Sequence, residues 1–76
     1  MNSYMNFGEA LESMKGGHRV HRVGWNGKNM WIAIQNSNEF SKMTLPYIYM
    51  STAQEDLVPW LASQTDILAH DWDTVI

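Results

Sequence analysis

The chain has 76 residues, no cysteine and a formal net charge of −3 at pH 7. A chain of this length forms one domain with a small core, and without cysteine it holds neither a disulfide framework nor a thiolate metal site. The acidic balance argues against binding to polymeric nucleic acid, because that affinity rests on many lysine and arginine side chains.

The first predicted element is a helix over residues 6–15. Asn6 stands at the N-cap position, and Glu9 stands where its side chain can reach back to the Asn6 amide. The apolar residues that follow recur at i, i+3, i+4 and i+7 and form one face: Phe7, Ala10, Leu11 and Met14. Gly16 and Gly17 end the helix, because glycine adopts the left-handed conformation without strain. We expect this helix to have a packing role.

Residues 18–23 predict a strand that contains the basic cluster of the chain. Its side chains alternate between two faces, and neither face is purely apolar. Charged side chains commonly protect the edge of a sheet, so we expect an edge strand or a strand at an interface. The alternative is that Arg19 or Arg22 helps to hold an anion.

Asn26-Gly27 predicts a tight hairpin turn of type I′, because Asn-Gly accommodates the positive φ that both central residues need. The second strand of the hairpin covers residues 29–35, and its apolar character on both sides predicts a central position in the sheet. Trp25 then lies at or beside the turn. Its indole has three possible roles, which are packing in the core, stacking on a base, and packing across a subunit contact.

The following segments predict a loop and further strands. Proline at position 59 breaks a short return strand. Trp72, in the last strand, is expected to face inward. The predicted segments are a loop over 36–46, a strand over 47–52, a turn over 53–56, a return strand over 57–58 and a last strand over 71–76.

Pro59 to Asp66 combines a proline, an indole and four consecutive polar residues. Ser63, followed three residues later by Asp66, resembles a capping box, so we predict a short helix over 64–70. The first amides of a helix lack intrahelical partners, and beside Trp60 they would form a cradle for a phosphate-bearing aromatic ligand. The alternative is that Ser63 only caps the helix and Trp60 only fills the core.

These elements predict an α+β fold, with an N-terminal helix packed on a small antiparallel sheet and a short second helix before the last strand. Residues 1–5 form an N-terminal lead, and residues 6–76 form a single ligand-binding domain. The four tryptophans and six methionines are a large apolar content for this length, so we expect a homo-oligomer. No apolar run approaches the roughly 20 residues that span a membrane, and the N-terminus lacks the features of a signal peptide. The absence of cysteine fits the cytosol.

The motifs give little support for catalysis. Ser63 and Thr65 are candidate nucleophiles, but on a helix His70 would lie about two turns from Ser63. An approach by His18 or His21 from elsewhere in the fold stays open. There is no glycine-rich phosphate loop, metal-ligand spacing or cofactor fingerprint. We therefore predict a protein that is not an enzyme, with no cofactor and no metal site.

Three blocks of sequence resemble a small phage and bacterial family that was long labelled a domain of unknown function. It includes the second type of Thoeris anti-defence protein, a phage-encoded sponge. The similarity extends from Met5 to Val75. The blocks are 6–11, 24–28 and 57–66, and Asp71-Trp72 follows them.

The resemblance implies a homotetramer that sequesters cyclic ADP-ribose isomers made by the TIR enzyme of Thoeris defence. Such proteins hold the signal without cleaving it, so the defence effector is not activated. Some relatives also trap cyclic dinucleotides at a second kind of site. The resemblance places this activity in the cytoplasm of the infected host.

The residues themselves offer groups that suit such a ligand. Trp25 and Trp60 can stack on a base, and Asp66 can accept hydrogen bonds from ribose hydroxyls. Further hydrogen bonds can come from four residues: Asn26, Ser63, Gln64 and Thr65. Because the chain is too small to enclose the ligand alone, we expect a pocket between protomers. The alternative is a non-catalytic phage structural or protein-interaction module, in which the exposed aromatic residues contact another protein.

Overall fold

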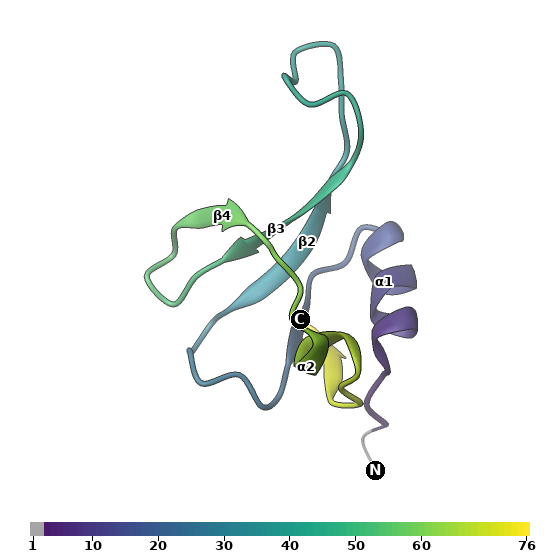
Figure 1. The fold of residues 1–76 in the computed structure, drawn as a ribbon, viewed down its shortest axis with the longest axis vertical. Coiled ribbons are helices and arrows are strands. Elements are labelled where there is room, and N and C mark those ends of the chain that lie inside the picture. The colour runs from purple at the N-terminus through teal and green to yellow at the C-terminus, as the bar shows by residue number, and fades with distance from the viewer. Residues whose placement is uncertain (1–2) are drawn as a thin grey trace.

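The computed structural model describes residues 3–76 and shows two helices and one sheet (Figure 1). The elements are α1 Phe7–Lys15, β1 Val20–Arg22, β2 Trp31–Gln35, β3 Tyr47–Ser51, β4 Leu57–Pro59, α2 Gln64–Ile67 and β5 Trp72–Thr74. The strands form one antiparallel sheet in the order β4-β3-β2-β1-β5. This arrangement confirms the predicted α+β fold.

The helix α1 forms as its end signals predict. The Asn6 side chain accepts a hydrogen bond from the Glu9 amide at 2.8 Å, and the Asn6 amide donates to Glu9 Oε1 at 3.0 Å. Gly17, just beyond the helix, has φ 95°, which only glycine adopts without strain. Ala10 and Met14 on the apolar face are buried, which confirms the predicted packing role.

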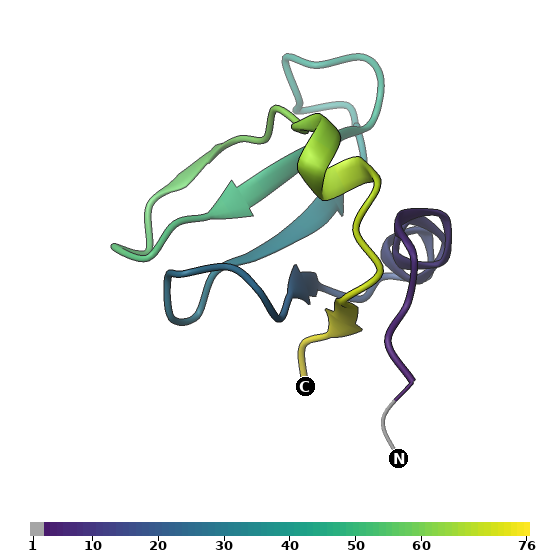
Figure 2. The ribbon, with the colours of Figure 1, turned by 60° about the horizontal axis from the view of Figure 1, so that its bottom comes forward.

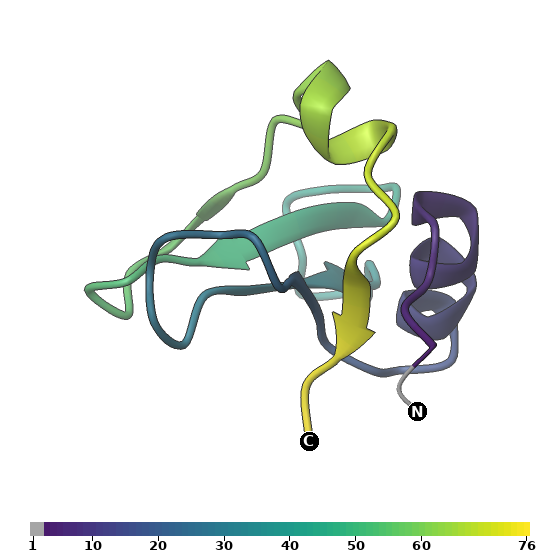
Figure 3. The ribbon, with the colours of Figure 1, turned by 90° about the horizontal axis from the view of Figure 1, so that it is seen from below.

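The core lies between α1 and one face of the sheet. Val20 in β1, Ile32 in β2 and Trp72 in β5 are fully buried there, together with Ala10 and Met14 of α1. Figure 2 shows α1 beside the strands β1 and β5, and Figure 3 shows α2 standing away from the sheet on extended connections. The segment that carries α2 therefore depends on side chains for its placement.

The prediction that residues 18–23 form an edge strand is wrong. β1 lies between β2 and β5, and it pairs with β5 at Val20, His21 and Arg22. The edges of the sheet are β4 and β5. The prediction failed because β5 comes from the far end of the chain, so its pairing with β1 leaves no local signal.

The predicted type I′ turn at Asn26-Gly27 is also wrong. Within residues 3–76, positive φ occurs at Gly17, Asn29 and Glu55 and at neither central residue of the predicted turn. β1 and β2 pair only at Val20 and Ile32, so the residues between them form a wide loop. A Cβ at Gly27 would meet the Met30 side chain, which would have to move to make room for it.

The remaining predicted elements appear with shifted ends. The loop 36–46 stays irregular and extends beyond the sheet (Figure 1). β4 includes Pro59 instead of ending before it, which an edge strand tolerates. α2 ends at Ile67, three residues before the predicted end at His70. Met1 and Asn2 of the predicted lead lie outside the described residues, and Met5 exchanges backbone hydrogen bonds of 2.8 and 3.1 Å with Trp72.

No helix within residues 3–76 is long and apolar enough to cross a membrane. In the same part of the chain, no group of three or more acidic or histidine side chains is placed to hold a metal ion.

Candidate functional site

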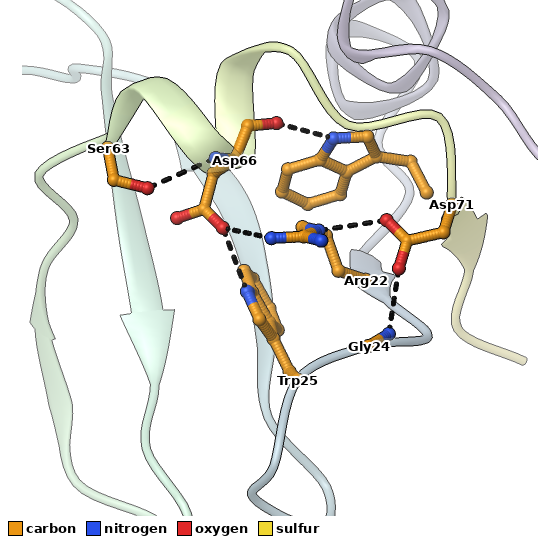
Figure 4. A network of polar contacts seen from close by, with 7 residues as sticks. Arg22, Gly24, Trp25, Ser63, Asp66 and Asp71 are labelled. Atoms are coloured by element: carbon orange, nitrogen blue, oxygen red, sulfur yellow. Dashed lines mark hydrogen bonds and ion pairs between the residues drawn. The ribbon is translucent and has the colours of Figure 1, made fainter.

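Arg22 connects β1 to both ends of the segment that leads from α2 to β5 (Figure 4). Its Nη1 donates to Asp66 Oδ1 at 2.8 Å, and its Nε donates to Asp71 Oδ1 at 2.8 Å. The side chains of Arg22, Asp66 and Asp71 keep only 17%, 15% and 29% of their surface exposed. Ion pairs with this degree of burial are screened less by water than pairs at the open surface.

Asp66 forms further hydrogen bonds besides its ion pair with Arg22. Its Oδ1 also accepts a hydrogen bond from Trp25 Nε1 at 3.1 Å, and its carbonyl accepts one from Trp72 Nε1 at 3.0 Å. Its amide donates to Ser63 Oγ at 3.1 Å, so Ser63 caps α2 as predicted. The Asp66 side chain does not return to the Ser63 amide as in a full capping box, because it is directed to Arg22 and Trp25.

The loop after β1 is held by a hydrogen bond to the carboxylate of Asp71. The Gly24 amide donates to Asp71 Oδ2 at 2.8 Å. A Cβ at position 24 would lie 2.9 Å from that oxygen, so a side chain there would displace the carboxylate. Glycine at this position thus allows the backbone to approach Asp71 closely.

The three charged groups stabilise one another's ionised forms. Burial acts to raise the pKa of Asp66, but hydrogen bonds from Arg22 and Trp25, with Ser63 nearby, bring that pKa below its ordinary value. The hydrogen bond from Arg22 is the main reason why the pKa of Asp71 is lowered, and the Gly24 amide adds to it. The pKa of Arg22 is raised by its bonds to Asp71 and Asp66.

These lowered pKa values predict a loss of stability in acid. Asp66 and Asp71 bind protons less readily in the folded protein than in the unfolded chain, so they stabilise the fold above about pH 4 and lose this effect as the pH falls through their folded pKa values. Their contribution is expected to stay constant from pH 5 to 8. Urea unfolding at a series of pH values from 3 to 8 measures it.

The control for this measurement is the double variant Asp66→Asn, Asp71→Asn. It is expected to be less stable at pH 7 and to lose less stability between pH 5 and 3. Equal losses for the variant and the wild type would show that the acid sensitivity comes from other groups.

Trp72 lies at the centre of an aromatic cluster beside this network. Its ring lies 5.3 Å from Trp25, 5.4 Å from Phe7 and 6.2 Å from Trp60, centroid to centroid, and all three contacts are edge-to-face. Phe7 and Trp60 are themselves 5.9 Å apart. Edge-to-face geometry is favourable for aromatic pairs. The cluster therefore joins α1 and β5 firmly to the loop after β1, which carries Trp25, and to the segment after β4, which carries Trp60.

An open hollow lies at the β4 end of the sheet. Its volume is about 750 Å³, within the usual range for small-molecule sites. Residues of the loop 36–46, β3, β4, Gln35 of β2 and Trp60 line it, and none of them is a lysine, arginine, aspartate or glutamate. The hollow therefore suits an aromatic or apolar group better than a phosphate.

The structure divides the predicted ligand-binding residues into three groups. Trp60 alone among them lines the hollow. Trp25, Ser63 and Asp66 meet in the network around Arg22. The other three are exposed on the loop after β1 or on the first turn of α2, and they are Asn26, Gln64 and Thr65. The role of all seven in binding a ligand stays a prediction.

The sequence reasoning missed Asp71 and gave Arg22 only a minor role. A signal was present in the sequence, because Arg22 shares a strand face with the apolar Val20, which the structure shows to be fully buried. A cation on an inward face needs carboxylate partners. No pattern in the sequence indicated that the loop 36–46 lines the hollow, because this depends on how the loop folds over β3 and β4.

The Thoeris anti-defense 2-like domain matches residues 5–75 of this chain. The chain belongs to the Thoeris anti-defense 2-like family. Among its relatives, Thoeris anti-defense 2 of Bacillus phage SP01 is 40% identical over 88 aligned positions, which cover 99% of each of the two proteins. The Thoeris anti-defense 2-like match includes the whole Arg22 network and the aromatic cluster, and it confirms the resemblance found in the sequence.

Proposed function

We propose that this protein is a phage anti-defence sponge that acts in the cytoplasm of the infected host. It binds cyclic ADP-ribose-type immune signals and holds them unchanged, so that the Thoeris effector is not activated. The observation that carries the proposal is membership of the Thoeris anti-defense 2-like family over residues 5–75, supported by a phage relative of that name. Cyclic dinucleotides are a second ligand class for the same function.

The aromatic hollow supports the part of the proposal that concerns the base. Trp60 packs on Phe7 and Trp72, and it also lines the hollow of about 750 Å³. A rigidly held indole is a good stacking partner for a purine. Because no cation lines the hollow, the pyrophosphate has to be held by other groups, and a homotetramer with sites between protomers provides them.

The carboxylate of Asp66 supports the part that concerns ribose. Both hydrogen bonds to this carboxylate from residues 3–76 reach Oδ1, and Oδ2 points to the side of Ser63 (Figure 4). Oδ2 and the exposed Ser63 hydroxyl are thus neighbouring groups that can bind the hydroxyls of a ribose. Gln64 and Thr65 follow Ser63 on the exposed side of α2 and add further donors.

The arrangement of Ser63 also favours binding without cleavage. Its Oγ accepts a hydrogen bond from the Asp66 amide, and it is not bonded to a histidine among the described residues. A serine nucleophile needs a base within hydrogen-bond reach to take its proton. We therefore propose that Ser63 binds the ligand and does not attack it.

Calorimetry with cyclic ADP-ribose isomers tests the proposal, with linear ADP-ribose as the comparison ligand. Wild type is expected to bind at least one cyclic isomer, and Trp60→Ala is expected to bind it about tenfold more weakly or worse, since stacking on one base contributes about 1–3 kcal/mol. Trp31→Ala is the matched control, because Trp31 packs on Tyr49, away from the aromatic cluster. Absence of binding to every isomer would contradict the proposal.

Exposed apolar side chains favour one alternative, a module that binds another protein. Phe40 and Leu45 on the loop 36–46, and Leu57 on β4, are 88%, 75% and 66% exposed. Leu45 and Leu57 both line the hollow, and an exposed apolar surface of this kind is typical of a protein contact. In that case Leu57→Ser would abolish capture of the partner protein, and no cyclic nucleotide would bind to the wild type.

A further inference from the structure

Arg22 holds a segment that has few other contacts with the rest of the protein. α2 has only four residues, and none of them is buried. A helix of this length has no stability of its own in water. Its direction therefore depends on the groups that tie it to the sheet, and the side chain of Asp66 provides the strongest of these ties.

The guanidinium of Arg22 suits this task because it is planar and binds two carboxylates at once. Nη1 and Nε point to Asp66 and Asp71, which stand at the two ends of the turn between α2 and β5. Trp25 Nε1 shares Asp66 Oδ1 with Arg22, which turns the other oxygen away from both (Figure 4). A lysine has a single ammonium on a flexible stem and cannot reproduce this geometry.

We infer that Arg22 is a positioning residue for ligand recognition: by binding Asp66 and Asp71 together, it fixes the direction in which Asp66 presents Oδ2 beside the Ser63 hydroxyl. This inference rests on the proposed function. The ligand chemistry that follows is a ribose with two neighbouring hydroxyls. Arg22 acts through the two carboxylates, to which its Nε and Nη1 donate.

The test compares two ligands in three proteins by calorimetry. The ligands are a cyclic ADP-ribose isomer and its analogue without the ribose hydroxyls, and the proteins are wild type, Arg22→Lys and Arg19→Lys. Arg19 is the matched control, because it comes just before the same strand and its guanidinium stacks 4.9 Å over the Trp31 ring. Binding is measured under conditions in which urea unfolding shows that each variant is folded.

Wild type and Arg19→Lys are expected to lose about tenfold or more in affinity when the hydroxyls are removed from the ligand. Arg22→Lys is expected to bind both ligands equally, at the level of the analogue. A general loss of structure would weaken both ligands together, so the ratio separates positioning from stability. The indole N–H resonances of Trp25 and Trp72 are expected to shift in Arg22→Lys and to stay in place in Arg19→Lys.

Asp71→Asn provides a second variant if Arg22→Lys does not fold. It removes one charged partner and keeps an oxygen for the Gly24 amide, and it is expected to lower the ligand ratio in the same direction. A folded Arg22→Lys or Asp71→Asn protein that keeps the wild-type ratio of the two ligand affinities and unshifted indole resonances would overturn this inference. That result would leave the proposed function standing. A wild type that binds neither ligand would overturn the proposed function.

Discussion

Arg22→Met is expected to lower the free energy of unfolding by about 2–4 kcal/mol. Removing one partner of a buried ion pair costs about 3–5 kcal/mol, because the remaining charges lose their compensation, and the partial exposure of this site reduces the cost somewhat. Two carboxylates, Asp66 and Asp71, are left without their cation in this variant. In a domain of 76 residues such a loss removes much of the total stability. Urea unfolding followed by tryptophan fluorescence measures it.

Two further variants test whether the loss of stability comes from the ion pairs of Arg22. Arg19→Met removes an exposed arginine that stacks on Trp31, and it is expected to cost about 1 kcal/mol or less. Adding Asp66→Asn and Asp71→Asn to Arg22→Met is expected to recover part of the lost stability, since the uncompensated charges are gone. A loss below about 1 kcal/mol for Arg22→Met would contradict the view that the network holds the fold together.

Trp72→Ala is expected to be as damaging, with a loss of about 4 kcal/mol. The indole is fully buried, and it contacts three aromatic rings from α1 and from two loops. Truncating a buried tryptophan removes apolar contacts and leaves a cavity, which together cost about 3–5 kcal/mol. The hydrogen bond from its Nε1 to the Asp66 carbonyl is lost as well.

Trp31→Ala is the control for Trp72→Ala. Trp31 is half-buried and contacts Tyr49 and Arg19, away from the aromatic cluster. Its replacement is expected to cost less than half as much in the urea unfolding experiment. Equal losses for the two variants would show that Trp72 is not the centre of the core.

The local patterns of the sequence predicted most of the elements. The capping residues and glycines of α1, the apolar strand β2 and the cap at Ser63 are encoded within a few residues, so reading the chain in order finds them. The place of β1 could not be predicted in this way. It depends on pairing with β5 at positions such as His21 and Asp73, which are far apart in the chain.

The Asn26-Gly27 turn shows how tertiary contacts override a local signal. Trp25, just before these residues, has its ring against Trp72 and its Nε1 on Asp66. Both contacts draw the loop towards the core. Asn29 takes the positive φ that the pattern assigned to Asn26 and Gly27.

For the candidate site, the residue types indicated which side chains could take part, but they did not indicate the hydrogen bonds that join these side chains. Trp25, Ser63 and Asp66 were chosen as separate ligand contacts, and the structure joins them through hydrogen bonds to Asp66. In the sequence, Asp71 is only the first residue of the predicted last strand, with no sign of a partner. Its role depends on Arg22 reaching it from β1, which only the folded chain shows.

The most direct test of sequestration without cleavage uses the signal made by an activated Thoeris TIR enzyme. The signal is mixed with an excess of this protein and filtered, and the retained protein is then heated. Mass spectrometry is expected to find no signal in the filtrate and the intact cyclic molecule in the heated fraction. Signal that stays in the filtrate would show that the protein does not bind it, and a hydrolysed product after heating would show that the protein is an enzyme.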